Sequence, residues 1–256
     1  MGETTTIDFA IIGSGNMANF LAEHLVKRKL NLTQIHSRNT LSGNALSERV
    51  NCTFEADINS INAAVIFVAV TDNQVVKILR KLPLNSIVLS TSGVINLAKS
   101  SHPDGGVFYP LQTLSKTNYS DPFSGPILLE AKNEMVSNYL IQLCKKLHFK
   151  HKFTRSIERK NIHLIAVFLN NFINHVACTG FLEAKKRGVD IALLKPLMEK
   201  TFKAILANQS CENQSGPAKR NDKKTINQHL ELLDGETKKL YKSLTKSILS
   251  KHGHKL

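Results

Sequence analysis

Near its start the sequence passes from a short apolar run into a glycine turn and then into a helical pattern. Residues 7–13 are mostly apolar, Gly13 and Gly15 stand one residue apart, and residues 16–29 repeat apolar side chains at helical spacing. Glycine destabilises both strands and helices, so a turn that keeps two glycines must need the space that side chains would fill. The order strand, Gly-x-Gly-x-x-Ala, helix is the order of a dinucleotide-binding turn.

Each small residue of this turn has its own expected task. Gly13 permits the tight turn, Gly15 lets a diphosphate approach the backbone, and Ala18 lets the helix pack closely on the strand. The first turn of the helix would then offer free N–H groups and the positive end of its dipole to the phosphates. The alternative is a glycine turn that binds no ligand.

Short apolar runs alternate with helical patterns through the first half of the chain. An unbroken apolar run such as AAVIFVAV, residues 63–70, predicts a strand that is buried on both faces. Strands of this kind separated by helices predict an α/β fold, a Rossmann-like parallel sheet covered by helices. The other strands that we expect are residues 34–37, 86–90, 106–109 and 127–129.

The second half has a different character and predicts an all-α domain. Residues 156–187 form a helical run interrupted only by Gly180, and residues 191–208 and 225–249 predict further helices. The turn NQSGPAKRND precedes the last of them, and Asp222 there is expected to cap the next helix or to help close a pocket with Arg220. We therefore predict a nucleotide-binding domain over residues 1–152 and a helical substrate or dimerisation domain over residues 153–256.

The positive charge is confined to the second half. The formal net charge is +14, but residues 1–144 carry 11 Lys and Arg against 11 Asp and Glu. The basic half lacks zinc-finger spacing, stacked aromatic residues and RNA-recognition motifs, so we predict no nucleic-acid partner. The sequence has no run of about 18 apolar residues, so we predict no membrane span. The four scattered cysteines indicate reduced thiols in a cytoplasmic protein with no metal site.

The residues after the second predicted strand indicate the type of cofactor. An NAD site places an acidic residue there for the ribose 2′-hydroxyl. This chain has no acidic residue between Glu23 and Glu48, and has Ser37, Arg38 and Asn39 instead. An arginine can donate two hydrogen bonds to a 2′-phosphate, which predicts NADP as the cofactor. The alternative is an exposed loop arginine.

Further polar residues follow the next two strands, at the sheet edge where open α/β folds bind ligands. Thr71 and Asp72 follow the apolar strand, and the segment STSG, residues 90–93, follows its neighbour. For Asp72 we favour a helix cap over a catalytic acid. The predicted cofactor-binding residues are Gly13, Ser14, Gly15, Asn16, Met17, Ser37, Arg38, Asn39, Val70, Thr71 and Ser92.

The first helix of the basic half has a narrow polar line on an otherwise apolar surface. At 100° per residue, Arg159, His163, Asn170 and Asn174 fall within about 60° of one another, and Lys160 and Asn171 flank them. A surface helix has a broader polar face, so this pattern predicts a buried helix whose polar line faces a cleft. A structural hydrogen-bond network is the equal alternative.

The chain resembles the NADP-dependent oxidoreductases related to pyrroline-5-carboxylate reductase and 6-phosphogluconate dehydrogenase, in the branch with a DUF2520 C-terminal domain. The matching segments include GSGNMA, HSRN, IFVAVTDNQV, LSTSG, FYPLQTLS, NIHLIAVFLNNFINH and QSGPAKRND. The resemblance implies a cofactor domain followed by a helical domain that often forms a homodimer. In one respect the chain departs from the pattern: better-known dehydrogenases of this group carry Lys and Asn four residues apart, whereas here Leu164 follows Lys160 by four.

The resulting hypothesis is hydride transfer between NADPH and a small carbonyl or imine substrate in an interdomain cleft. His163 would move the proton, because imidazole titrates near neutral pH. Asn170 or Asn171 would orient the substrate, and Gln112 would reach the nicotinamide or the substrate. Two alternatives stay open: a non-catalytic NADP(H) sensor or scaffold, and an enzyme that uses a deazaflavin as its hydride partner.

Overall fold

The computed structural model describes residues 7–100, 102–115, 119, 123–209 and 211–254. The chain divides into two compact units, Met1–Asn170 and Asn171–Leu256. The first unit therefore holds the sheet and also the start of the long helical run. The domain boundary between residues 152 and 153 stays a prediction.

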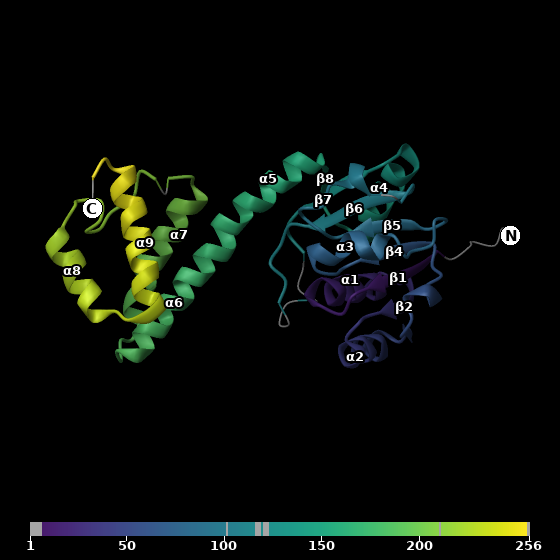
Figure 1. Ribbon diagram of the computed structural model, residues 1–256, viewed down its shortest axis with the longest axis horizontal. Helices are drawn as coiled ribbons and strands as arrows, with labels where there is room; N and C mark the ends of the chain where they lie inside the picture. Colours follow the sequence, from purple (N-terminus) through teal and green to yellow (C-terminus); the bar gives the residue numbers. More distant parts are fainter. Residues whose placement is uncertain (1–6, 101, 116–118, 120–122, 210, 255–256) are drawn as a thin grey trace. The chain divides into compact units, whose positions relative to one another are not determined.

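The first unit contains an eight-stranded sheet with the order β3-β2-β1-β4-β5-β6-β7-β8 (Figure 1). Neighbouring strands run parallel except for β6 and β7, which pair antiparallel. This is the Rossmann-like α/β sheet that the sequence predicts. The strands are β1 (Asp8–Ile12), β2 (Asn31–His36), β3 (Thr53–Glu55), β4 (Val65–Val68), β5 (Ile87–Ser90), β6 (Gly105–Pro110), β7 (Ile127–Ala131) and β8 (His151–Phe153).

Alternate residues of β1 build two cores, one on each face of the sheet. Phe9 and Ile11 belong to a cluster with residues of the helices α1 (Asn16–Lys27), α2 (Thr40–Val50) and α4 (Glu134–Leu147). Ala10 and Ile12 belong to the opposite cluster, with residues of α3 (Asp72–Leu79). Successive side chains of a strand point to opposite faces, so a strand covered on both sides is apolar throughout.

The antiparallel β6–β7 pair corrects the expectation of a wholly parallel sheet. A parallel neighbour needs a crossover connection, usually a helix, whereas an antiparallel neighbour does not. The described part of residues 111–126 contains no helix. The sequence does not predict α2, α4, β3 or β8, because their apolar patterns are short or interrupted by polar residues.

The helical run that begins after β8 is continuous from Ser156 to Lys186. It consists of α5 (Ser156–Ala166), a π-helical segment η3 (Val167–Phe172) and α6 (Ile173–Lys186). The prediction that this helix is buried is wrong: Arg159 is the buried residue of α5, and apolar residues such as Leu164 and Phe168 are exposed. Of the predicted polar line, Arg159 is fully buried, His163 lies against Tyr109 and Asn170 donates to Thr113.

By length and composition, this helix is long and apolar enough to cross a membrane, contrary to the prediction of no membrane span. Its most apolar window has a mean hydropathy of 1.4. A single helix of this kind is weak evidence for a membrane span. Its first turn holds the fully buried Arg159, so that end of the helix belongs to the globular sheet unit.

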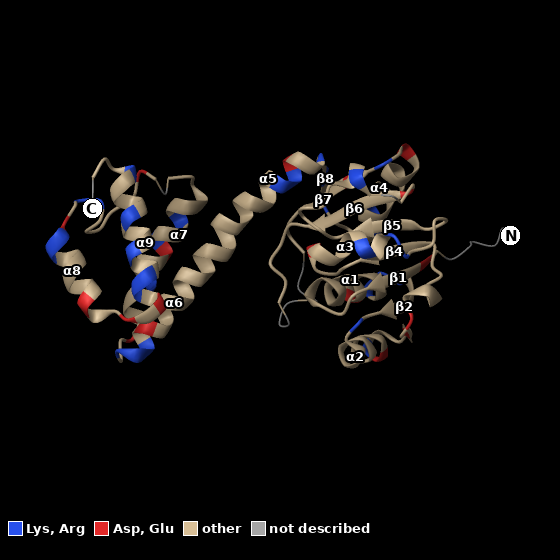
Figure 2. Cartoon of the chain, in the orientation of Figure 1, with Lys and Arg blue, Asp and Glu red and all other residues tan. Residues whose placement is uncertain are grey.

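The second unit is all-α, as predicted. Asp222 caps α8 by accepting a hydrogen bond from Thr225 N at 3.0 Å, which confirms the expected cap. Lys and Arg residues gather on α8 and α9 (Figure 2). After α6 the elements are η4 (Ile191–Leu194), α7 (Lys195–Leu206), α8 (Lys223–Leu232) and α9 (Gly235–Lys251).

His24 makes the first unit sensitive to acid. Its buried ring packs against Phe20 and Phe149, with centroid distances of 4.4 and 5.0 Å. Burial, together with Lys27 and Arg28, lowers the pKa of His24 from 6.5 to about 4. The unfolded chain therefore binds this proton more readily. Stability from the neutral ring is present above pH 6.5 and is lost as the pH falls through 4, by roughly 3 kcal/mol in all.

Replacing His24 with phenylalanine should therefore flatten the fall in stability between pH 6.5 and pH 4. Urea unfolding at several pH values across this interval measures the slope. The exposed His151→Phe variant is the control and should keep the slope of the wild type. Equal slopes for the wild type and His24→Phe would show that folding does not lower the pKa of His24.

Candidate functional site

A pocket of about 650 Å³ lies at the carboxyl ends of β1, β2 and β4. None of its described lining residues is acidic. His36, Thr40 and Gln74 also line it, although they were not among the residues predicted from the sequence. The predicted cofactor residues that the structure brings together here are Gly13, Ser14, Gly15, Ser37, Arg38, Asn39, Val70 and Thr71.

The two glycines of the turn are required for different reasons. Gly13 has a φ of +132°, and a Cβ built on it would lie 2.2 Å from the carbonyl oxygen of Ala69. The fold itself therefore requires glycine at this position. A Cβ on Gly15 would meet no atom within 4 Å. Protein packing does not explain Gly15, whereas close approach of a ligand to the backbone does.

Gly15 is also the N-cap of α1, and no side chain caps this helix. The first N–H groups of a helix lack partners within the helix, and the positive end of the dipole lies beside them. Open space over Gly15 and an uncapped helix start together form a cradle for a diphosphate. The residues present therefore fit a dinucleotide.

Three serine hydroxyls meet beside this cradle. Ser14 Oγ lies 2.7 Å from Ser37 Oγ and 2.7 Å from Ser42 Oγ. Asn39 caps α2 by accepting from Ser42 N at 3.1 Å, and the exposed Arg38 stands at the rim. Hydroxyl groups and a guanidinium without a carboxylate suit a phosphate better than a ribose hydroxyl pair.

A second polar group lies where β4 and β5 end. Ser92 Oγ donates to Asp72 Oδ1 at 2.5 Å and accepts from Val94 N and Ile95 N at 3.2 Å each. The prediction that Asp72 caps α3 is wrong, because Thr71 is the N-cap and Asp72 begins the helix. The carboxylate instead holds the loop after β5, which places it at the ligand-binding edge of the sheet.

His163 joins this edge from α5. Its Nδ1 lies 3.0 Å from Tyr109 Oη, and a Cβ on Gly93 would come within 3.0 Å of the same nitrogen. Glycine at position 93 thus makes room for the imidazole. Burial, and then the Asp72 carboxylate, raise the pKa of Tyr109, so its side chain stays a neutral phenol near pH 7.

Tyr109 is the residue of this site that sequence reasoning missed. It lies in the segment FYPLQTLS near the end of β6, and its position after an apolar run was the available signal. His163, by contrast, was selected from the polar line of its helix. The structure places these two residues, 54 positions apart, in one hydrogen-bonded pair.

Asn16 and Met17 lie in the first turn of α1 but outside the lining of the pocket. Asn16 Nδ2 donates to the carbonyl oxygen of Leu114 at 2.9 Å, and its Oδ1 accepts from Tyr119 Oη at 2.6 Å. Met17 packs against the core beneath the helix. Asn16 therefore ties the segment after β6 to the glycine turn.

The remaining predicted residues lie at three different places. Gln112 Oε1 accepts from Ser124 N at 3.4 Å, a contact within the connection between β6 and β7. Asn170 Nδ2 donates to Thr113 Oγ1 at 2.5 Å, from the π-helical segment. Segments of π-helix often occur at functional sites. Asn171 is exposed and begins the second unit.

Comparisons with solved structures connect this fold to oxidoreductases. A proposed NADP oxidoreductase from Bacteroides fragilis is 28% identical, with a TM-score of 0.84 over 95% of this chain and 98% of that one. A reductive aminase from Aspergillus terreus, solved with NADPH and ethyl-5-oxohexanoate, is 14% identical, with a TM-score of 0.64 over 98% and 97%. An imine reductase from Myxococcus stipitatus, solved with NAD⁺, is 11% identical, with a TM-score of 0.60 over 96% and 95%. The last two share the fold.

Two protein-family models match separate parts of the chain. The model described as NADP oxidoreductase, coenzyme F420-dependent, matches residues 8–96, and DUF2520, a domain of unknown function, matches residues 125–248. No curated protein matches the sequence. These matches confirm the resemblance and the prediction of NADP as cofactor. The chain thus combines a region matched by an NADP oxidoreductase model with a following DUF2520 region, on a Rossmann-like fold.

Proposed function

We propose that the protein transfers hydride between NADPH and a small carbonyl or imine compound, with His163 moving the proton. One observation carries the proposal. The His163–Tyr109 pair and the Asp72–Ser92 pair lie at the sheet edge where β4, β5 and β6 end, next to the strands whose ends form the dinucleotide pocket. Ligands of open α/β sheets bind at this edge.

The cofactor supplies the hydride, and the residues of the pocket hold it in place. The uncapped start of α1 beside Gly15 binds the diphosphate. Arg38 donates hydrogen bonds to the 2′-phosphate, and Ser37 and Asn39 add neutral donors beside it. The absence of a carboxylate from the described lining removes a charge that would repel this phosphate.

In the reductive direction, the imidazolium of His163 donates its Nε2 proton to the substrate oxygen or nitrogen as hydride reaches the adjacent carbon. Its Nδ1–H stays hydrogen-bonded to the oxygen of Tyr109 and fixes the orientation of the ring. The reverse reaction runs through the neutral imidazole, which takes the proton from an alcohol or amine. In both directions the hydride passes between cofactor and substrate, and His163 donates or accepts the proton.

Several finer assignments belong to the same proposal. Asn170 and Asn171 are candidates for orienting the substrate, and Gln112 is a candidate for contact with the nicotinamide. The exposed apolar residues of the α5–α6 helix suit a homodimer through the helical domain. The unpaired state of all four cysteines suits the cytoplasm.

The first test measures cofactor preference. NADPH and NADH are titrated by fluorescence against the wild type and Arg38→Ala. The wild type should prefer NADPH, and the variant should lose about 10- to 100-fold in NADPH affinity, because a charge-assisted hydrogen bond contributes about 1.5–3 kcal/mol. The affinity for NADH should change little.

Arg28→Ala, an exposed arginine that ends α1, is the matched control and should keep the preference. Carbonyl and imine compounds are then screened for oxidation of bound NADPH, with a deazaflavin included because the matched family model is described as F420-dependent. Equal affinity of the wild type for NADPH and NADH would overturn the role of Arg38. Tight NADPH binding without any turnover would favour the sensor or scaffold.

A further inference from the structure

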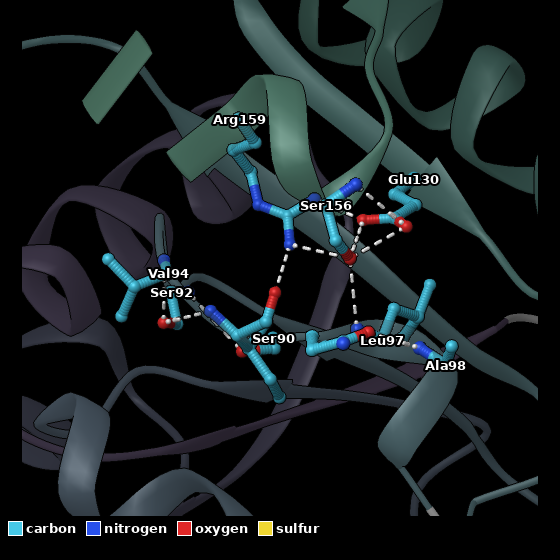
Figure 3. Close-up of polar contacts among 10 residues, drawn as sticks. Ser90, Ser92, Val94, Leu97, Ala98, Glu130, Ser156 and Arg159 are labelled. Carbon is cyan, nitrogen blue, oxygen red and sulfur yellow. Dashed lines mark hydrogen bonds and ion pairs between the residues drawn. The ribbon is translucent and has the colours of Figure 1, made fainter. Parts of the chain in front are cut away.

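A charged cluster that the proposed reaction does not use lies beneath the first turn of α5 (Figure 3). Arg159 is fully buried and forms an ion pair with Glu130 of β7. Its other terminal nitrogen donates to the carbonyl oxygen of Ile95 at 2.5 Å. One guanidinium thus joins a helix, a strand and the loop after β5.

Ser156 completes the cluster from the start of the same helix. Its hydroxyl lies 2.8 Å from both carboxylate oxygens of Glu130, and it accepts from Leu97 N at 3.1 Å. Glu130 also accepts from Ser156 N at 3.1 Å. We call Glu130, Ser156 and Arg159 the clamp, because together they hold α5 on residues 95–97.

The loop that the clamp holds also contacts the His163 ring. It starts at Ser92, whose hydroxyl holds Val94 N and Ile95 N, and it includes Gly93, on which the imidazole lies. Arg159 and His163 are four residues apart, so they stand on the same face of α5, one turn from each other. Any shift of this helix relative to the loop would move the imidazole away from Tyr109.

We propose that the clamp positions the His163 ring. It keeps the ring against Gly93 and within hydrogen-bond distance of Tyr109. Glu130, Ser156 and Arg159 act through His163 and are positioning residues. The inference rests on the proposed function for its catalytic meaning, but the geometry that it asserts is measurable without any substrate. Charged groups held within a low-dielectric network restrict motion more strongly than exposed ones.

The test follows the His163 ring by NMR of protein labelled with ¹⁵N-histidine, in which two-bond correlations report the tautomer and hydrogen bonding of each ring nitrogen. His163→Gln identifies the signals, and Tyr109→Phe identifies the shift due to the Tyr109 hydrogen bond. In Ser156→Ala and Glu130→Gln, the His163 signals should move toward those of Tyr109→Phe, while the signals of the other histidines stay in place. NADPH affinity should stay at the wild-type level.

Glu158→Gln is the matched control, because it breaks the exposed Lys152–Glu158 ion pair on the same helical turn without touching the clamp. Its His163 signals should equal those of the wild type. If folded Ser156→Ala and Glu130→Gln both keep the wild-type His163 signals, the clamp does not position the ring and the proposal is overturned. The proposal is also overturned if the His163 signals of Tyr109→Phe equal those of the wild type.

Ser156→Ala alone decides the question if Glu130→Gln fails to fold, since loss of one hydroxyl leaves the ion pair in place. The outcome is separate from that of the proposed function. Displaced His163 signals in a protein that oxidises no NADPH would support the clamp and reject hydride transfer. Oxidation of NADPH by the wild type, together with unchanged His163 signals in the clamp variants, would support hydride transfer and reject the clamp.

Discussion

Replacing His163 with glutamine should lower the rate of NADPH oxidation by a substrate about 10²- to 10⁴-fold, the usual contribution of a positioned general acid. Glutamine keeps a hydrogen-bond donor of similar size but cannot give up a proton. The affinity for NADPH should not change, because His163 does not line the dinucleotide pocket. Single-turnover kinetics with the substrate found in the screen, with cofactor binding measured in parallel, tests both statements.

Two variants support the interpretation of that result. Tyr109→Phe should have a smaller effect than His163→Gln, because it removes the hydrogen bond to Nδ1 and leaves the proton donor. His175→Gln changes an exposed histidine farther along the same helical run and should keep the wild-type rate. If His163→Gln turned over at the wild-type rate, the proton would come from another group or from water.

Replacing Arg159 with methionine should lower the free energy of unfolding by about 3–5 kcal/mol, because it leaves the largely buried Glu130 carboxylate without its partner charge. Methionine approximates the length of the arginine stem, so the loss reflects the charge more than the volume. Urea unfolding followed by circular dichroism measures the change. The double variant Arg159→Met/Glu130→Gln should recover part of the loss, since no charge then remains in the cluster.

The exposed ion pair between Lys152 and Glu158 provides the comparison. Lys152→Met should cost less than about 1 kcal/mol, as is usual for surface pairs. A loss for Arg159→Met as small as that of Lys152→Met would mean that water reaches Glu130 and that the cluster is not a rigid clamp.

The sheet and its glycine turn could be predicted because their signals are local. The run AAVIFVAV can be buried on both faces in only a few arrangements, and the strand, glycine turn and helix order is specific to one kind of site. The prediction of NADP also rested on a local signal, since the residues HSRN follow the second strand directly. The direction of β7 was not predictable in this way, because it depends on the path of the connection from β6.

The candidate proton-transfer site could be predicted only in part. Helical spacing selected Arg159 and His163 as one polar line, but it could not show that Arg159 is fully buried against Glu130. It also could not show that Asp72 holds Ser92 instead of capping α3. In each pair the two residues belong to different elements, and a local sequence pattern does not show which elements lie side by side.

By itself the sequence determined the Rossmann-like sheet, the need for a bare backbone at Gly13 and Gly15, and the prediction of NADP as the cofactor. Each of these follows from residues within about one turn or one strand of each other, where covalent geometry and periodicity limit the choices. The tertiary structure alone decided that Tyr109 meets His163 and that Glu130 and Ser156 hold the helix carrying it. Those contacts join residues between 26 and 54 positions apart, and only the packing of the whole unit brings them within hydrogen-bond distance.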